Sequence, residues 1–186
     1  MSDGIRLHFY PDDDSDLGVG DVIGGPQVGV PTHCVVECAA GWLQIDLKKC
    51  RWKPSDPFPT RSRITVSRQL SPEQQAACVD ALSRMIGRKY DKSRLVYCWA
   101  RRRIGKAARA LRGLLVHWPS RVICVDGPLV VFGIIGDKYP QEWQAASVAS
   151  VMWHALDTGL AVDSQATTVP PAMMAHMTKW HEEGRA

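Results

Sequence analysis

The sequence lacks the features that define membrane-spanning, secreted and repetitive proteins. The longest apolar runs, such as LVVFGIIG at 129–136, are far shorter than the roughly 20 residues of a membrane-spanning helix. The first residues are acidic and include no apolar core, so they do not resemble a secretory signal. Internal repeats and low-complexity tracts are also missing. We therefore expect a soluble protein made in the cytoplasm, with association with a virion left open.

No C-x-x-C pair occurs among the six cysteines, and the histidines show no ligand spacing. A zinc site or any other metal or cofactor is therefore not expected. The missing secretory signal also argues against a framework of disulfides. Five cysteines are interpreted as small buried apolar residues: Cys34, Cys38, Cys50, Cys78 and Cys98.

The composition is that of a globular protein, with 45% hydrophobic and 23% charged residues in 186. This length suits one domain with a core, covering residues 1–186. The net charge of +4 does not by itself imply nucleic acid. Alternation and capping signals predict an α+β fold, a small antiparallel sheet with helices packed on one side. The strands are expected at 5–10, 32–38, 43–50 and 64–70, and the helices at 71–87, 92–118, 139–159 and in the tail.

Two helical segments carry clear local signals. Ser71, Pro72 and Gln74 form the start of a capped helix that Gly87 ends.

The segment at about 92–118 is a basic helical insertion, broken near Gly105 or Gly113. Its cations are Arg101, Arg102, Arg103, Lys106, Arg109 and Arg112, and they fall between apolar residues, namely Leu95, Trp99, Ile104, Ala107, Leu111 and Leu115. This pattern suits either an anionic partner or, more simply, the solvated face of an amphipathic helix.

His33 opens a strand of an expected hairpin. If Ala39 and Ala40 form the turn, Asp46 lies directly opposite His33, and Gln44 lies on the same face. A carboxylate there could orient the imidazole as a base. A longer turn would change the register, and His33 could equally be a solvated residue at the start of the strand.

Cys124 follows an extended run at 121–123. The apolar segment at 129–135 comes soon after it and could be a helix with Pro128 as its first residue. A thiol at a helix N-terminus has a lowered pKa, and the N–H groups there can stabilise an oxyanion. The alternative is a buried structural cysteine.

Six short motifs occur in an order that resembles the circularly permuted, NlpC-type (YiiX-like) cysteine hydrolases. The resemblance spans roughly residues 18–178. The motifs are Gly20-Asp21-Val22-Ile23, Thr32-His33-Cys34-Val35-Val36-Glu37, Asp46 in LQIDL, Gly87-Arg88-Lys89-Tyr90-Asp91, Val122-Ile123-Cys124-Val125-Asp126 and Thr168-Val169-Pro170-Pro171-Ala172-Met173.

The resemblance implies a permuted papain-like fold in which Cys124 is the nucleophile, His33 the base and Asp46 the orienting group. It implies amide hydrolysis by acyl transfer, with cell-wall peptides as substrates, or lipids and other esters instead. The backbone N–H of Cys124 would stabilise the oxyanion together with a second donor that the sequence does not identify. Tyr90 and Asp91 are expected to be structural, with Tyr90 packing beside the site and Asp91 capping or turning the chain.

A non-catalytic binding component of a phage tail or other assembly is the main alternative. It is motivated by the sequence Cys-Val-Asp-Gly at 124–127, where the family usually has Cys-Ser-Glu-Leu. A third hypothesis is a protein that binds anionic surfaces through Arg101, Arg102, Arg103 and Lys106.

Overall fold

The computed structural model describes residues 4–11, 31–139, 143–158 and 161–162. The first and last motifs of the family resemblance, at 20–23 and 168–173, lie outside these residues. So does the helix expected in the tail.

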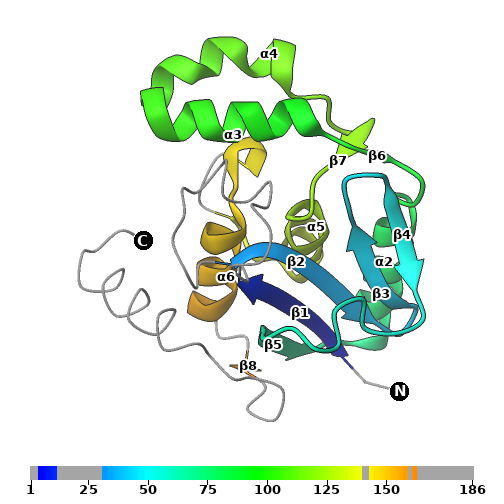
Figure 1. Cartoon of the computed structure of the whole chain (residues 1–186). Helices are drawn as coiled ribbons and strands as arrows, with labels where there is room; N and C mark the ends of the chain where they lie inside the picture. Colours follow the sequence, from blue (N-terminus) through cyan, green and yellow to red (C-terminus); the bar gives the residue numbers. More distant parts are fainter. Residues whose placement is uncertain (1–3, 12–30, 140–142, 159–160, 163–186) are drawn as a thin grey trace.

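The described part of the chain folds as an α+β structure around one antiparallel sheet of six strands, in the order β4-β3-β2-β1-β5-β8 (Figure 1). The predicted α+β class is therefore confirmed. A separate parallel pair is formed by β6 and β7. The strands are β1 (Gly4–Pro11), β2 (Pro31–Cys38), β3 (Gly41–Ile45), β4 (Cys50–Lys53), β5 (Ile64–Gln69), β6 (Lys89–Tyr90), β7 (Arg121–Val122) and β8 (Ala161–Val162).

The β2–β3 hairpin has the predicted turn at Ala39 and Ala40, and its register pairs Val36 with Leu43. The expectation of one strand continuing to Cys50 is wrong. β3 ends at Ile45, and β4 then runs back along it. The chain turns here because the carboxylate of Asp46 accepts hydrogen bonds from the backbone N–H groups of Lys48 and Lys49.

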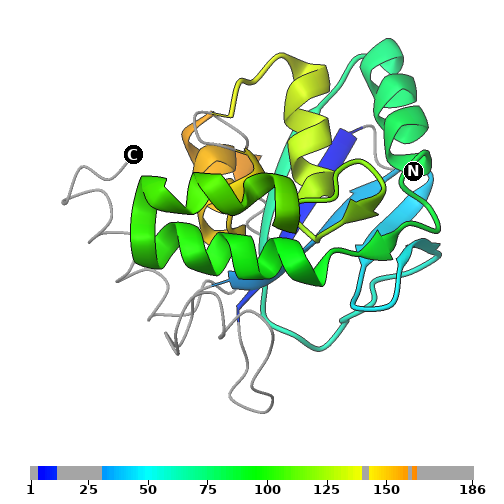
Figure 2. The same ribbon diagram turned by 90° about the horizontal axis from the view of Figure 1, so that it is seen from above.

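The helices are α2 (Pro72–Ser83), α3 (Lys92–Ile104), α4 (Arg112–Leu115), α5 (Asp126–Ile135) and α6 (Val148–Asp157), with 3-10 turns η1 (Gly105–Leu111) and η2 (Trp143–Ala145). Both α5 and α6 pack on β2, and α2 packs on α5 (Figure 2). The core between these helices and the sheet is built from alternate strand residues such as Leu7, Val36 and Val66, all buried.

The capping box predicted for α2 is present, with reciprocal bonds between Ser71 and Gln74. The α-helix ends at Ser83, however, and not at Gly87. After Ser83 the backbone hydrogen bonds change from the i→i−4 spacing of an α-helix to the i→i−3 spacing of a 3-10 turn. The bond from Ile86 N–H to Ser83 C=O is one example. Gly87 then takes a positive φ of 79°, which turns the chain towards β6.

The basic segment forms a helical hairpin, residues 92–115, which we call the basic hairpin. It comprises α3, η1 and α4 and lies at one end of the molecule (Figure 1). The predicted break at Gly105 is confirmed, since that residue has a φ of 56° and separates α3 from η1. Gly113 lies within α4 and does not break the chain direction. Across the described residues, every helix is too short or too polar to cross a membrane.

The helix expected at 139–159 begins later. Ser147 caps α6 through a capping box with Ser150, and a 3-10 turn precedes it. The two serines satisfy N–H groups that would otherwise lack partners at the helix start. The local signal for this cap was present in the sequence, but the apolar residues before it suggested a longer helix.

Candidate active site

The structure brings Cys124 and His33 together from distant parts of the chain. Cys124 lies in the turn between β7 and α5, and His33 lies near the start of β2, opposite Tyr10 of β1. The ring of His33 packs edge-on against Phe58, with 5.3 Å between ring centroids. The imidazole lies near enough to the Cys124 thiol to contribute, after Cys34, to lowering its pKa. The fold therefore brings these two side chains into the same region.

The helix that follows Cys124 begins at Asp126, earlier than the expected start at Pro128. Gly127 tolerates the helical conformation before a proline because it has no Cβ to clash with the pyrrolidine ring. Pro128 fits the first turn because its missing N–H would have no partner there. Cys124 thus sits two residues before α5, near the positive end of the helix dipole.

A close contact between α5 and β2 sets the position of this turn. A Cβ added to Gly127 would lie 2.9 Å from Cγ2 of Val36, closer than atoms normally approach. Only glycine therefore allows the start of α5 to lie this near β2. His33 and Cys34 belong to the same strand, so this contact places the Cys124 turn beside them.

The pKa of Cys124 is lowered well below its ordinary value. Hydrogen bonding from the Cys34 thiol is the largest cause; burial opposes it, and hydrogen bonding and charge from His33 act in the same direction as Cys34. Cys34 also donates its thiol hydrogen to the backbone carbonyl of Cys124, with 3.2 Å between Sγ and O. Burial, followed by the nearby Cys124, raises the pKa of Cys34. The pKa values of the two thiols are therefore shifted in opposite directions, lowered for Cys124 and raised for Cys34.

Tyr90 packs beside Cys124, as expected from the G-x-x-Y-D motif. Its strand, β6, runs parallel to β7, and Tyr90 pairs there with Val122. Burial raises the pKa of the Tyr90 phenol well above its usual value, and the charge of and hydrogen bond to Cys124 raise it further. The Tyr90 phenol therefore lies close to the Cys124 sulfur and is held in its protonated form.

Asp46, the expected orienting residue, has its hydrogen-bond partners elsewhere among the described residues. Its carboxylate forms an ion pair with Arg51 and accepts the N–H groups of Lys48 at 2.9 Å and Lys49 at 3.1 Å. Burial alone would raise the pKa of Asp46, but these N–H groups and Arg51 together lower it. The predicted register is correct near the turn, but the β2–β3 ladder ends at Val36 and Leu43, before Asp46.

Gln44 is a second polar residue on the same face of β3. Its side chain is buried, and Oε1 has no hydrogen-bond partner among the described residues. Nε2 of His33 is likewise buried and without a partner in this part of the chain. Two buried polar atoms on adjacent strands are thus left without the partner that such atoms normally have.

A buried ion pair holds the Cys124 turn from the other side. Nη1 of Arg94 lies 2.5 Å from Oδ1 of Asp126, and Oδ2 of Asp126 accepts the N–H of Ile123 at 2.7 Å. The guanidinium also donates to the backbone carbonyls of Gln144 and Trp143. The sequence reasoning missed this pair. Its one signal was an arginine within the otherwise apolar stretch of α3, next to Leu95.

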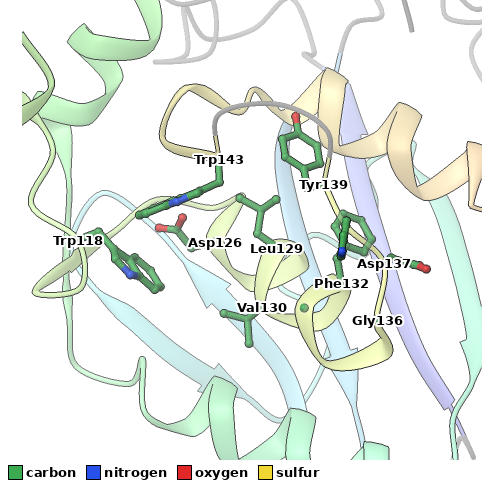
Figure 3. A pocket seen from close by; sticks show the side chains of 11 residues that line it. Trp118, Asp126, Leu129, Val130, Phe132, Gly136, Asp137, Tyr139 and Trp143 are labelled. Carbon is green, nitrogen blue, oxygen red and sulfur yellow. The ribbon is translucent and has the colours of Figure 1, made fainter. Parts of the chain in front are cut away.

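An open pocket of about 710 Å³ adjoins the outer side of α5 (Figure 3). Aromatic side chains form much of its wall: Trp118, Phe132, Tyr139 and Trp143. Asp126 contributes to the lining, but Cys124 and His33 do not. The pocket is therefore connected to the Cys124 turn through Asp126, and the thiol itself faces β2.

The described residues contain no group of His, Cys, Asp and Glu side chains that could hold a metal ion. Comparison with family models, curated proteins and solved structures found no match. The chemistry of this site therefore has to be inferred from its own geometry.

Proposed function

We propose that the protein is a cysteine hydrolase in which Cys124 is the nucleophile and His33 the general base and acid. The observation that supports this most directly is that the Cys34 side chain, followed by the His33 ring, lowers the pKa of the Cys124 thiol. A thiolate beside an imidazole at the start of a helix is the arrangement that thiol acyl transfer needs.

The reaction would proceed through a thioester. The Cys124 thiolate attacks the carbonyl carbon of an amide or ester, and the bond to the leaving group breaks as His33 donates a proton to it. His33 then removes a proton from water, which attacks the thioester and releases the acid and the free thiolate. Cell-wall peptides are the proposed amide substrates, and lipid or other esters are the alternative.

The oxyanion formed in each step needs two donors. The backbone N–H of Cys124 is one of them. The Tyr90 hydroxyl, which already interacts with the sulfur and has a raised pKa, is the proposed second donor. This assigns a role that the sequence left open, and it changes Tyr90 from a packing residue to a catalytic one.

Gln44 takes the orienting role in this proposal in place of Asp46. A hydrogen bond from His33 Nε2 to Gln44 Oε1 would satisfy both unpartnered atoms and leave Nδ1 of His33 directed at the thiol. With these residues the site is that of a papain-like hydrolase in permuted order, which is the finer fold assignment that we propose.

The test uses p-nitrophenyl acetate as a small acyl donor and intact-mass and peptide mapping to find the acetylated residue. We expect a burst of p-nitrophenol and an acetyl group on Cys124, both lost in Cys124→Ser. In His33→Ala the burst should slow by about a hundredfold or more. Cys38→Ala, a substitution of another buried cysteine, is the matched control and should keep the burst.

Iodoacetamide labelling gives a second readout that does not need a substrate. Cys124 should be labelled first, and this preference should disappear in His33→Ala. Equal labelling of all six cysteines, with no acetyl adduct, would contradict the proposal and would favour a non-catalytic component of an assembly.

The orienting role is tested by comparing Gln44→Ala with Asp46→Ala. We expect Gln44→Ala to slow acetylation of Cys124 and to change its pH profile, because the ring loses its fixed orientation. Gln44→Glu, which keeps an acceptor at that position, should restore part of the rate. A loss of activity in Asp46→Ala that exceeds the loss in Gln44→Ala would return the role to Asp46.

A further inference from the structure

The basic hairpin exposes large apolar side chains along its length. The exposed fractions are 52% for Val96, 43% for Trp99, 56% for Ile104, 38% for Leu111 and 73% for Leu114. Three of these, Trp99, Ile104 and Leu111, belong to the apolar series that an ordinary amphipathic helix would bury. Isolated exposed leucines are common, but a continuous segment with this many is typical of an interaction surface.

The same segment carries charge of a single sign. The basic hairpin, residues 92–115, includes eight Lys and Arg and no Asp or Glu. Arg94 is used internally, because it is buried against Asp126. The remaining cations of the hairpin include five with exposed side chains, at Lys92, Arg103, Lys106, Arg109 and Arg112. The surface therefore combines apolar groups with positive charge and has no acidic residue of its own.

We propose that the basic hairpin docks on an anionic phospholipid bilayer, lying in the interface without crossing it. Aliphatic side chains and Trp99 would enter the boundary between headgroups and acyl chains, while the arginines and lysines contact phosphate and other anionic headgroups. Long cationic side chains can keep their charged ends in water as their stems cover apolar surface. Nucleic acid would explain the charge but would leave Val96, Ile104 and Leu114 without a role.

The hairpin is linked tightly to the candidate active site. Arg94 on α3 bonds Asp126, which directly precedes Gly127 at the start of α5. Asp91, the N-cap of α3, also donates its backbone N–H to the carbonyl of Val122, two residues before Cys124. A docked hairpin would therefore hold Cys124 at a fixed position relative to the bilayer, but the docking itself does not depend on the proposed hydrolase activity.

The test is co-sedimentation of the full chain with phosphatidylcholine vesicles that contain or lack phosphatidylserine. We expect binding only with phosphatidylserine and a marked loss at high salt. Arg103→Glu combined with Lys106→Glu should weaken binding by about tenfold or more. The matched control, Lys48→Glu with Lys49→Glu, makes the same change in net charge at exposed residues outside the hairpin and should leave binding within about twofold.

A second variant separates insertion from charge. Trp99→Ser combined with Leu114→Ser keeps every cation, and it should weaken binding because less apolar surface enters the bilayer. Circular dichroism and urea unfolding of each variant check that the fold is kept. The Cys124→Ser variant should bind vesicles normally, so failure of the hydrolase proposal would not affect this result.

Three outcomes would overturn the inference. The first is equal binding to both vesicle types, and the second is equal weakening by the hairpin and control variants. The third is that the chain does not bind vesicles and instead binds duplex DNA, or instead forms dimers. Dimers that use this surface would be disrupted by Trp99→Ser combined with Leu114→Ser.

Discussion

Arg94 and Asp126 form an ion pair that is closed to solvent, with side-chain exposures of 0% and 1% and 2.5 Å between Nη1 and Oδ1. The pair joins α3 to the first residue of α5, and through Ile123 N–H it also fixes the turn that carries Cys124. Burial raises the pKa of Asp126 even though Arg94 and the Ile123 N–H lower it. The cost of removing two charges from water offsets much of their attraction, so we infer that the pair acts mainly by positioning the turn. Each charge would nevertheless be costly to bury without the other.

Arg94→Met should destabilise the protein by about 3–5 kcal/mol, because it leaves Asp126 buried without its partner. Arg94→Met combined with Asp126→Leu should recover much of that loss. Urea denaturation measures the free energy of unfolding in each case. Arg84→Met is the matched control, because Arg84 pairs with Asp80 on the exposed side of α2, and its loss should cost under about 1 kcal/mol. Equal losses for Arg94 and Arg84 would contradict the prediction.

Gly127→Ala should destabilise the protein by about 1–3 kcal/mol, because the new methyl group would overlap Cγ2 of Val36. Gly133→Ala in the same helix meets no atom within 4 Å and should instead be stabilising, by about 0.5–1 kcal/mol. Thermal unfolding of the two variants measures the difference. Adding Val36→Ala to Gly127→Ala should relieve the overlap, and a failure to do so would place the strain elsewhere.

The reactivity of Cys124 should persist at a lower pH than that of an ordinary thiol. Its lowered pKa keeps the thiolate as the pH falls, and alkylation is lost only below that pKa. Cys34→Ala and His33→Gln should each move the midpoint of the alkylation profile to higher pH, because each removes a side chain that lowers the pKa of Cys124. Mass mapping after timed exposure to iodoacetamide gives the profile for each cysteine.

Cys78 provides an internal comparison in that experiment. Burial raises its pKa to about 11, so its alkylation should increase only at alkaline pH. Coincident profiles for Cys124 and Cys78 would show that the contacts with Cys34 and His33 do not stabilise the thiolate.

Asp91→Ala should cost about 1–2 kcal/mol at neutral pH, since the side chain caps α3 and also accepts the N–H of His117 at 3.1 Å. Burial by itself would raise the pKa of Asp91, but bonds from Ser93, His117 and Arg94 lower it. The contribution is therefore present above the ordinary carboxyl pKa and is lost as the pH falls through the lowered one. Unfolding free energies of the wild type and the variant should converge in acid, and a constant difference would contradict the capping role.

Local features of the fold were predictable because neighbouring residues form them. The capping box of Ser71 and Gln74 and the break at Gly105 each depend on a few consecutive positions. The β2–β3 register also followed from the short turn at Ala39 and Ala40. The strand β4 was missed because a side chain, Asp46, bends the chain by bonding backbone N–H groups, and an alternating pattern does not reveal such a bond.

The candidate site was only partly predictable. Cys124 and His33 were singled out by chemistry and by the order of motifs, while Asp46 was chosen from an ideal ladder that in fact stops at Val36 and Leu43. Gln44, Tyr90 and Cys34 gained their proposed roles only from their surroundings. No periodic pattern could show that Cys34 donates to the carbonyl of Cys124, ninety positions away in the sequence.

The sequence by itself determined most of the helices and strands, several of their caps and turns, and the residue types available for thiol chemistry, because these depend on backbone preferences and short-range hydrogen bonds. Tertiary structure alone decided which groups meet at Cys124 and that the apolar residues of the basic hairpin face outward. Those outcomes depend on close packing between distant segments, as at Gly127 and Val36, and on the cost of burying a charge such as Arg94 without its partner.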